Sequence, residues 1–135
     1  MSTHDNVRSA GSVLAVDDCP AMREVLRASL ECLGYSVQAV DSGWAALDAV
    51  SEGRFDVIVL DVEMPGLDGM AVGRALRSAP SGAAAAIAMH SSVAEAEVRA
   101  GFDDYDLYVP KSADVRSLGE QVDRLVRSRR SPRRP

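Results

Sequence analysis

Short apolar runs alternate along the chain with stretches in which apolar residues recur every three or four positions. An uninterrupted apolar run is typical of a strand buried on both faces, and the wider spacing is typical of an amphipathic helix. The predicted strands are Val13–Val16, Ser36–Val40, Phe55–Leu60, Ala84–Met89 and Leu107–Val109. Helices are predicted over Pro20–Leu33, Met70–Ser78 and Val93–Ala100. Two more are predicted to begin with a capping serine: one follows Ser42 and ends at Val50, and the last follows Ser112, with apolar residues from Val115 to Val126 on one face.

Strands and helices therefore alternate five times. Such βα repeats with right-handed crossovers build a parallel α/β sheet that carries helices on both faces. Ligands of these sheets bind beyond the carboxyl ends of the strands. The residues that end the strands are consequently the first place to look for chemistry. Trp44, in the second helix, is expected to pack against the core.

Length and composition fit one globular domain: the chain has 135 residues, of which 47% are apolar and 26% charged. No apolar run approaches the roughly 18 residues of a membrane span. The first residues are polar, which excludes a typical secretory signal. The two cysteines are too few for a disulfide framework and are interpreted as reduced thiols, so we expect a cytoplasmic protein.

Charge is unevenly distributed along the chain, although the net charge is only −5. Residues 129–135 hold four arginines and no acid, so residues 1–128 carry 11 basic and 20 acidic residues. An acidic body argues against nucleic acid as the main partner. We predict a flexible N-terminal segment at 1–11, one folded domain at 12–128 and a solvated basic tail at 129–135.

Three carboxylates stand at the ends of two predicted strands. Asp17 and Asp18 follow the first strand, and Asp61 follows the third. Because neighbouring parallel strands lie about 4.8 Å apart and end at the same edge, these acids should meet there. Clustered carboxylates repel one another unless a cation lies between them, and hard oxygen ligands suit Mg²⁺. The sequence therefore predicts a magnesium site.

Lys111 is the only lysine among 15 basic residues, the other 14 being arginine. It follows the fifth predicted strand, so it can reach the same edge of the sheet as the carboxylates. A lysine placed there would offset the negative charge and hold an anionic oxygen as a point charge. The bias toward arginine elsewhere makes an ordinary surface role for this one lysine the weaker interpretation.

These residues together resemble a known family. The segments Val16–Arg23 and Val59–Gly69, with Asp61 followed by Met-Pro-Gly-x-Asp-Gly, and Lys111 are similar to the receiver domain of two-component response regulators. The likeness covers about residues 12–128 and includes the single-domain chemotaxis regulators. It implies a doubly wound, flavodoxin-like fold with five parallel strands in the order 2-1-3-4-5.

The resemblance also implies roles for the strand-end residues. Asp61 would accept a phosphoryl group, Asp18 and Asp61 would bind Mg²⁺ directly, Asp17 would act largely through water, and the backbone carbonyl of Glu63 would complete the metal ligands. Mg²⁺ and Lys111 would neutralise charge on the transferring oxygens. Such a domain is a switch that catalyses only its own phosphorylation and dephosphorylation, not an enzyme acting on other substrates.

Partners follow from the same resemblance. The phosphoryl donor would be a sensor histidine kinase or a phosphotransfer protein, and the output would pass by contact to a downstream protein whose identity stays open. No DNA-binding domain and no membrane segment are expected, and the protein would be a monomer or a weak homodimer.

The fourth strand departs from the family pattern. Receivers normally carry threonine or serine where this strand ends, and its hydroxyl meets the phosphoryl group. The apolar pattern puts His90 at that position, whereas counting without gaps from Asp61 puts Ser91 there. Both residues remain candidates. A histidine in place of the hydroxyl would weaken the usual coupling between phosphorylation and output.

A second departure follows the fourth helix. Lys111 comes about three residues late relative to the family, so either a small insertion lies after Gly101 or the helix continues past it. Tyr108, rather than Tyr105, has the family's spacing to Lys111 for the aromatic residue that reports activation.

Two other functions compete with the phosphoacceptor. A pseudo-receiver would use the fold only to bind proteins, independently of phosphorylation; His90 favours it, and the intact acidic residues and Lys111 oppose it. A Mg²⁺-dependent phosphohydrolase would place a general acid/base two residues after the nucleophile. Glu63 has that spacing, but the chain has no room for a substrate-capping domain.

Overall fold

The computed structural model describes residues 10–79 and 84–130, which form a parallel five-stranded sheet. The strands are β1 (Gly11–Val16), β2 (Tyr35–Val40), β3 (Val57–Asp61), β4 (Ala86–Ser91) and β5 (Leu107–Pro110). Their order across the sheet is β2-β1-β3-β4-β5, and every neighbouring pair is parallel. This confirms the predicted doubly wound fold and its strand order.

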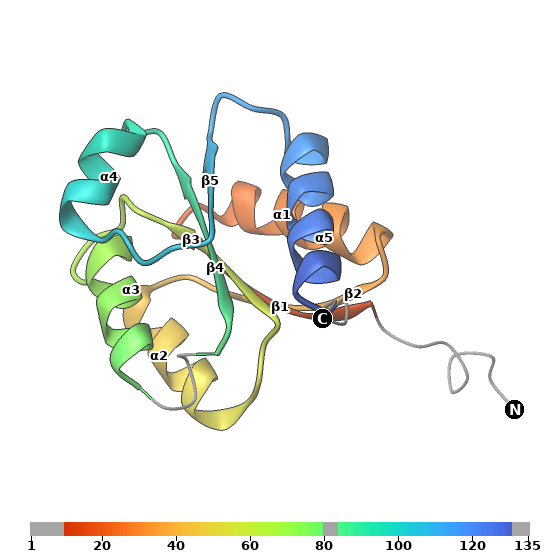
Figure 1. Ribbon diagram of the computed structural model, residues 1–135, viewed down its shortest axis with the longest axis horizontal. Helices are drawn as coiled ribbons and strands as arrows, with labels where there is room; N and C mark the ends of the chain where they lie inside the picture. Colours follow the sequence, from red (N-terminus) through yellow and green to blue (C-terminus); the bar gives the residue numbers. More distant parts are fainter. Residues whose placement is uncertain (1–9, 80–83, 131–135) are drawn as a thin grey trace, which may run out of the picture.

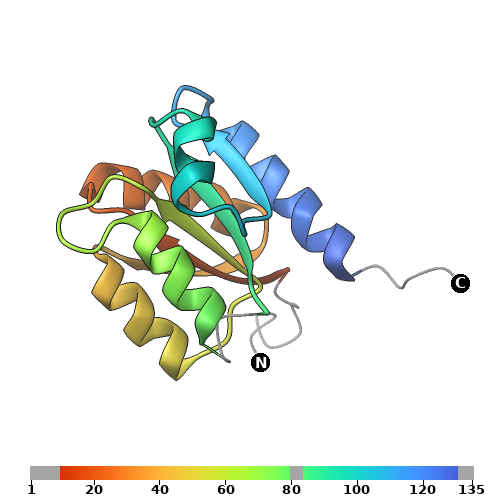
Figure 2. The ribbon, with the colours of Figure 1, turned by 60° about the vertical axis from the view of Figure 1, so that its left-hand side comes forward.

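Helices cover both faces of the sheet (Figures 1 and 2). They are α1 (Pro20–Cys32), α2 (Gly43–Glu52), α3 (Gly69–Ser78), α4 (Glu95–Gly101) and α5 (Val115–Arg130). In Figure 1, α1 and α5 lie on one side of the sheet and α2, α3 and α4 on the other. Each predicted element is present, with ends that differ by a few residues from the predicted ones.

Two separate hydrophobic cores result, because successive residues of a strand point to opposite faces. Leu14, Leu60 and Met89 pack toward α2, α3 and α4. Val13 and Val59 pack toward α1 and α5. Burial on both faces explains why the central strands are apolar at consecutive positions rather than at alternate ones.

Of the two serine caps that the sequence predicts, one is present in the structure and the other is not. Ser42 caps α2 as predicted, since its hydroxyl accepts a hydrogen bond from the amide of Ala45 at 3.1 Å. The prediction of Ser112 as the cap of α5 is wrong. Asp114 directly precedes that helix, and its carboxylate accepts from the amide of Ser117 at 2.7 Å. Ser112 lies instead in the turn after β5.

The predicted packing of Trp44 is also wrong, because its side chain is 65% exposed. The preceding residue, Gly43, faces the core so closely that a Cβ there would lie 2.6 Å from Val72. A helix turns about 100° per residue, so the next side chain points away from that contact. Ala46 and Val50 make the buried face of α2 instead.

The extra residues before Lys111 lie in a loop. Helix α4 ends at Gly101, and the amide of Phe102 donates to the carbonyl of Val98 at 2.8 Å. The chain then runs without regular structure to Leu107, where β5 begins. Of the two interpretations left open by the sequence, the structure has the short helix followed by a longer loop.

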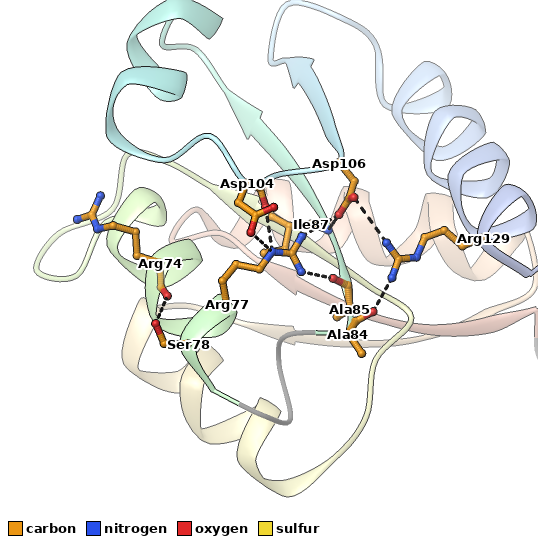
Figure 3. Close-up of polar contacts among 9 residues, drawn as sticks. All are labelled: Arg74, Arg77, Ser78, Ala84, Ala85, Ile87, Asp104, Asp106 and Arg129. Atoms are coloured by element: carbon orange, nitrogen blue, oxygen red, sulfur yellow. Dashed lines mark hydrogen bonds and ion pairs between the residues drawn. The ribbon is translucent and has the colours of Figure 1, made fainter.

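Arg77 of α3 fastens this loop to the sheet (Figure 3). Its guanidinium donates to the carbonyl of Asp104 at 2.9 Å and to that of Ala85 at 2.7 Å, and it pairs with the carboxylate of Asp106 at 2.9 Å. The same carboxylate accepts the amide of Ile87 in β4 at 2.9 Å. One arginine thus ties together α3, the start of β4 and the approach to β5.

The last turn of α5 is held near the loop before β5. The predicted boundary of the basic tail, 129–135, is therefore two residues too early, because the helix runs to Arg130. Arg129 and Arg130 belong to α5. Arg129 pairs with Asp106 at 3.5 Å, as Figure 3 shows, and Arg130 pairs with Asp56 at 3.0 Å. These contacts extend the helix beyond the predicted boundary; residues 131–135 lie outside the described part.

At the other end of the chain, the predicted flexible segment 1–11 extends one residue into the sheet. Gly11 is the first residue of β1 and pairs with Tyr35. Residues 1–9 lie outside the described part.

Candidate functional site

Four charged side chains meet at the edge of the sheet where the strands end. Asp17 and Asp18 follow the last residue of β1, Asp61 ends β3, and Lys111 follows the last residue of β5. Parallel strands end at one edge, and β1 and β3 are direct neighbours whose register pairs Val16 with Leu60. The topology therefore brings together residues that are up to 94 positions apart in the chain.

Lys111 reaches two of the carboxylates. Its Nζ lies 3.0 Å from Oδ1 of Asp61 and 3.3 Å from Oδ2 of Asp17. Its own amide donates to the carbonyl of Ser91 at 2.8 Å, which fixes the start of the turn after β5. Burial by itself lowers the pKa of the lysine. The hydrogen bonds and negative charges of Asp61 and Asp17 have a larger, opposite effect, so the pKa of Lys111 is raised above its usual value. The ammonium form is thus retained at neutral pH.

Asp61 is almost fully buried, with 1% of its surface exposed. Its Oδ1 accepts from Lys111 and, at 3.3 Å, from the amide of Glu63. Its Oδ2 has no hydrogen-bond partner among the described residues. Burial raises the pKa of Asp61 to about 6, with the charge of Asp17 adding to the rise and Lys111 opposing it. One oxygen of a strongly desolvated carboxylate therefore stays available for a ligand.

Asp17 is completely buried and held by the first turn of α1. Its Oδ1 accepts from the amide of Cys19 at 2.9 Å, and Arg23 donates to its carbonyl at 2.9 Å. Its Oδ2 lies beside Lys111 without a well-formed hydrogen bond. The sequence reasoning missed Arg23, because a side chain that contacts a backbone carbonyl leaves no signal in residue type or spacing.

Asp18, which is exposed, completes the acidic group. Asp17, Asp18 and Asp61 each offer one carboxylate oxygen within 4.8 Å of the others. Three carboxylates face a single ammonium, so the cluster keeps an excess of negative charge. Buried oxygens without hydrogen bonds beside hard oxygen ligands suit a small divalent cation such as Mg²⁺. The donor set therefore fits the predicted metal.

The chain between Asp61 and α3 depends on a close backbone approach. A Cβ at Gly69 would lie 2.1 Å from the carbonyl oxygen of Asp61 and 2.8 Å from Cα of Val62. Gly66 in the same turn has φ +78°, a conformation that favours glycine. Asp68 then caps α3 by accepting from the amide of Ala71 at 2.9 Å. The Gly-x-Asp-Gly part of the motif thus positions Asp61 through the backbone.

Glu63 lies in this turn with an exposed side chain. The hydroxyl of Ser92 donates to its Oε1, which connects the turn after β3 to the loop after β4. The side chain of Glu63 is thus oriented by Ser92, and the sequence prediction involves only its backbone carbonyl.

His90 is the neighbour of Asp61 across the two strands. The register pairs the two residues, and His90 is 2% exposed. Its Nδ1 is buried and has no hydrogen-bond partner in the described part of the chain. Burial lowers the pKa of His90 to about 4, and the charge of Lys111 contributes in the same direction. A neutral imidazole therefore lies beside the acidic group at pH 7.

Ser91 follows His90 in β4, so its side chain points to the opposite face of the sheet. Its hydroxyl accepts from the amide of Val93 at 2.8 Å. Of the two residues that the sequence left open, His90 shares the register position and the face of Asp61.

The two tyrosines are each engaged on the side of α4. Tyr108, in β5, donates from its hydroxyl to the carbonyl of Val93. Tyr105 donates to Glu95 at 2.6 Å and accepts from Arg99 at 3.1 Å. Tyr108 is thus the tyrosine that contacts the loop after β4, and Tyr105 holds the helix itself.

Comparison with known sequences places these features in one family. The model for "Response regulator receiver domain" matches residues 13–123. The response regulator MprA of Mycobacterium leprae is 42% identical over 118 residues, which are 85% of this chain and 50% of that protein. The chain therefore spans about half the length of the curated relatives that it matches.

Solved structures agree with the sequence comparison. The chemotaxis protein CheY4 of Vibrio cholerae superposes with a TM-score of 0.78 at 28% identity, covering 84% of this chain and 96% of that one. The response regulator TrrA of Thermotoga maritima, solved in complex with Mg²⁺ and BeF, has a TM-score of 0.76 at 32% identity and covers 84% and 97%.

Within the described residues, none of the helices combines the length and the apolar character that crossing a membrane requires.

Proposed function

Because the chain belongs to the response regulator receiver domain family of two-component systems, we propose that it is a phosphoacceptor switch with Asp61 as the residue phosphorylated. The observation that carries the proposal is the environment of Asp61. Its carboxylate is buried, one oxygen contacts Lys111 at 3.0 Å, and the other has no hydrogen bond in the described part of the chain. This arrangement leaves one oxygen free to form a bond while the other is held in place.

Mg²⁺ is the metal that this site would hold. Asp18 and Asp61 would be direct ligands with the backbone carbonyl of Glu63, and Asp17 would act largely through water. The clustering of carboxylate oxygens within 4.8 Å supports this assignment. When bound, Mg²⁺ neutralises negative charge on the phosphoryl oxygens and lowers the barrier to attack by a carboxylate.

Asp61 acts as the nucleophile. Its oxygen forms a P–O bond to the incoming phosphoryl group while the bond from phosphorus to the donor breaks, and the donor keeps that electron pair. The donor would be the phosphohistidine of a sensor histidine kinase or phosphotransfer protein. Lys111 holds Oδ1 of Asp61 in position and presents a positive charge to a phosphoryl oxygen.

His90 distinguishes this site from one in which a hydroxyl residue pairs with the phosphoacceptor across β3 and β4. We assign it to the position that faces the phosphoryl group, because it is the register partner of Asp61 and is buried beside it. An imidazole is larger than a hydroxyl and cannot follow the phosphoryl group in the same way. Coupling to the output face should therefore be weaker than in receivers with threonine or serine.

His90 is also the observation that favours the alternative, a pseudo-receiver that binds its partner without phosphorylation. In either case the signal passes by contact to a downstream protein.

Intact mass after incubation with acetyl phosphate and Mg²⁺ tests the proposal. We expect one phosphoryl group on the wild type and on Asp48→Asn, a control that removes the same charge from the exposed face of α2, and none on Asp61→Asn. No adduct on the wild type would favour the pseudo-receiver. Rapid consumption of acetyl phosphate without an adduct would favour a phosphohydrolase. An adduct that persists in Asp61→Asn would place the nucleophile elsewhere.

A further inference from the structure

A groove runs between the turn after β3 and the start of α4, beside the acidic site; the side chain of Glu63 lines it. Its volume is about 460 Å³. The walls come from the two loops that follow Asp61 and Ser91 and from the first turns of α3 and α4. Figure 1 shows α4 next to α3 on this side of the sheet. Ser92 of one loop donates to Glu63 of the other, which joins the walls at one end.

The groove is apolar where side chains from the core reach it. Val62 and Met64 are buried in its floor, and Met70 and Val93 are half-buried at its sides. Methionine side chains are flexible and polarisable, so they adapt to the shape of an apolar ligand better than branched side chains do. The floor can therefore accept a hydrophobic side chain from another molecule.

The rim of the groove carries only negative charge. Glu63, Asp68 and Glu97 line it, and no basic residue does. Among the ion pairs of the described residues, none involves these three carboxylates. Residues 1–128 carry 11 basic and 20 acidic residues, so the field around the groove also favours a cation.

We propose that this acidic groove binds a short segment of a partner protein in which arginine or lysine alternates with a large apolar residue. The groove is defined by its apolar residues Val62, Met64, Met70 and Val93 and by its rim of Glu63, Asp68 and Glu97. The apolar side chains of the segment enter the floor, and its cations lie along the rim. Both parts are needed, because exposed charge pairs contribute little without desolvated apolar contact. The inference concerns binding by the unphosphorylated protein and does not depend on phosphorylation of Asp61.

Two double variants of equal charge test the proposal. Asp68→Asn with Glu97→Gln removes two of the three negative charges of the rim, and asparagine keeps the cap of α3. Asp48→Asn with Glu52→Gln makes the same two changes on α2, where both residues are exposed and lie outside the groove. Any effect of net charge alone is equal in the two proteins.

The probes are three labelled peptides of equal length, measured by fluorescence anisotropy at physiological salt. One alternates arginine with leucine, the second replaces every leucine with serine, and the third replaces every arginine with glutamate. We expect the arginine–leucine peptide to bind the wild type and the α2 variant alike, and the rim variant about tenfold more weakly. The other two peptides should bind the wild type at least about tenfold more weakly than the first.

Equal binding by the two double variants would overturn the proposal, as would equal binding of the arginine–serine peptide. Amide chemical shifts of the wild type provide a second readout that requires no substitution. Shifts on adding the arginine–leucine peptide should concentrate at 62–70 and 93–97. Shifts concentrated on α1 and α5 instead would assign the peptide to another surface and refute the groove.

Discussion

Replacing Asp61 with asparagine should stabilise the protein at neutral pH when no divalent cation is present. The wild-type carboxylate is buried, and burial raises its pKa to about 6 from the usual value of 3.8. The unfolded chain is therefore ionised at a pH where the folded chain still binds a proton. Stability from this group is fully present below pH 3.8 and is lost as the pH rises through 6.

The size of the effect follows from this shift. The rise of the pKa from 3.8 to about 6 corresponds to about 3 kcal/mol at pH 7.5, where the carboxylate is ionised in both states. At pH 4.5 it corresponds to about 1 kcal/mol, because the folded state is then protonated and the unfolded state is only partly so. Asparagine has no charge to desolvate, but it gives up part of the contact with Lys111. We therefore expect Asp61→Asn to gain roughly 1–3 kcal/mol at pH 7.5 and about 2 kcal/mol less than that at pH 4.5.

Urea denaturation followed by circular dichroism in the presence of EDTA measures both values. Far-ultraviolet circular dichroism is preferable to fluorescence because Trp44, the single tryptophan, is 65% exposed. Asp48→Asn, an exposed carboxylate on α2, serves as the control and should change stability by less than about 0.5 kcal/mol at either pH. A difference between Asp61→Asn and wild type that is the same at both pH values would refute the reasoning, because the gain would not then come from ionisation.

Three further predictions follow from other parts of the site. Gly69→Ala should lower the free energy of unfolding measured in urea by more than about 2 kcal/mol, since the new Cβ would lie 2.1 Å from a backbone oxygen. Gly53→Ala is the control and should be near neutral, because its Cβ would lie 3.8 Å from the nearest atom. The wild type should lose stability as the pH falls from 6.5 to 4, because the pKa of His90 is lowered to about 4 in the folded state and the unfolded chain therefore gains a proton first. His90→Thr should remove this loss. Urea midpoints across that range check this, and an unchanged profile would contradict the burial of the imidazole. Mg²⁺ should raise the melting temperature of the wild type by mass action and raise that of Asp18→Asn less; equal rises would mean that the acidic group is not the metal site.

Much of this protein could be predicted from local chemistry. Strands buried on both faces need apolar residues at consecutive positions, so Val57–Leu60 is visible in the sequence without knowledge of its neighbours. The acids that interrupt such runs mark the strand ends, and parallel strands share an edge. Asp17, Asp18, Asp61 and Lys111 could therefore be brought to one site from the pattern alone.

Other features depended on contacts that no local pattern records. Residue type does not reveal strand register, so only the pairing of β3 with β4 distinguished His90 from Ser91 as the neighbour of Asp61. The exposure of Trp44 followed from the close approach of Gly43 to α3, a distance set by two helices packed on the same sheet.

The ends of α4 and α5 were likewise decided by tertiary contacts. A loop of several residues before β5 is stable because Arg77 and Asp106 satisfy its polar groups. Helix α5 continues to Arg130 because its last two arginines form ion pairs with carboxylates at the edge of the sheet opposite the acidic site. Local sequence determined which segments form strands and helices and which residues end them, since those depend on neighbours in the chain. Tertiary structure decided register, exposure and helix length, since those depend on partners distant in sequence.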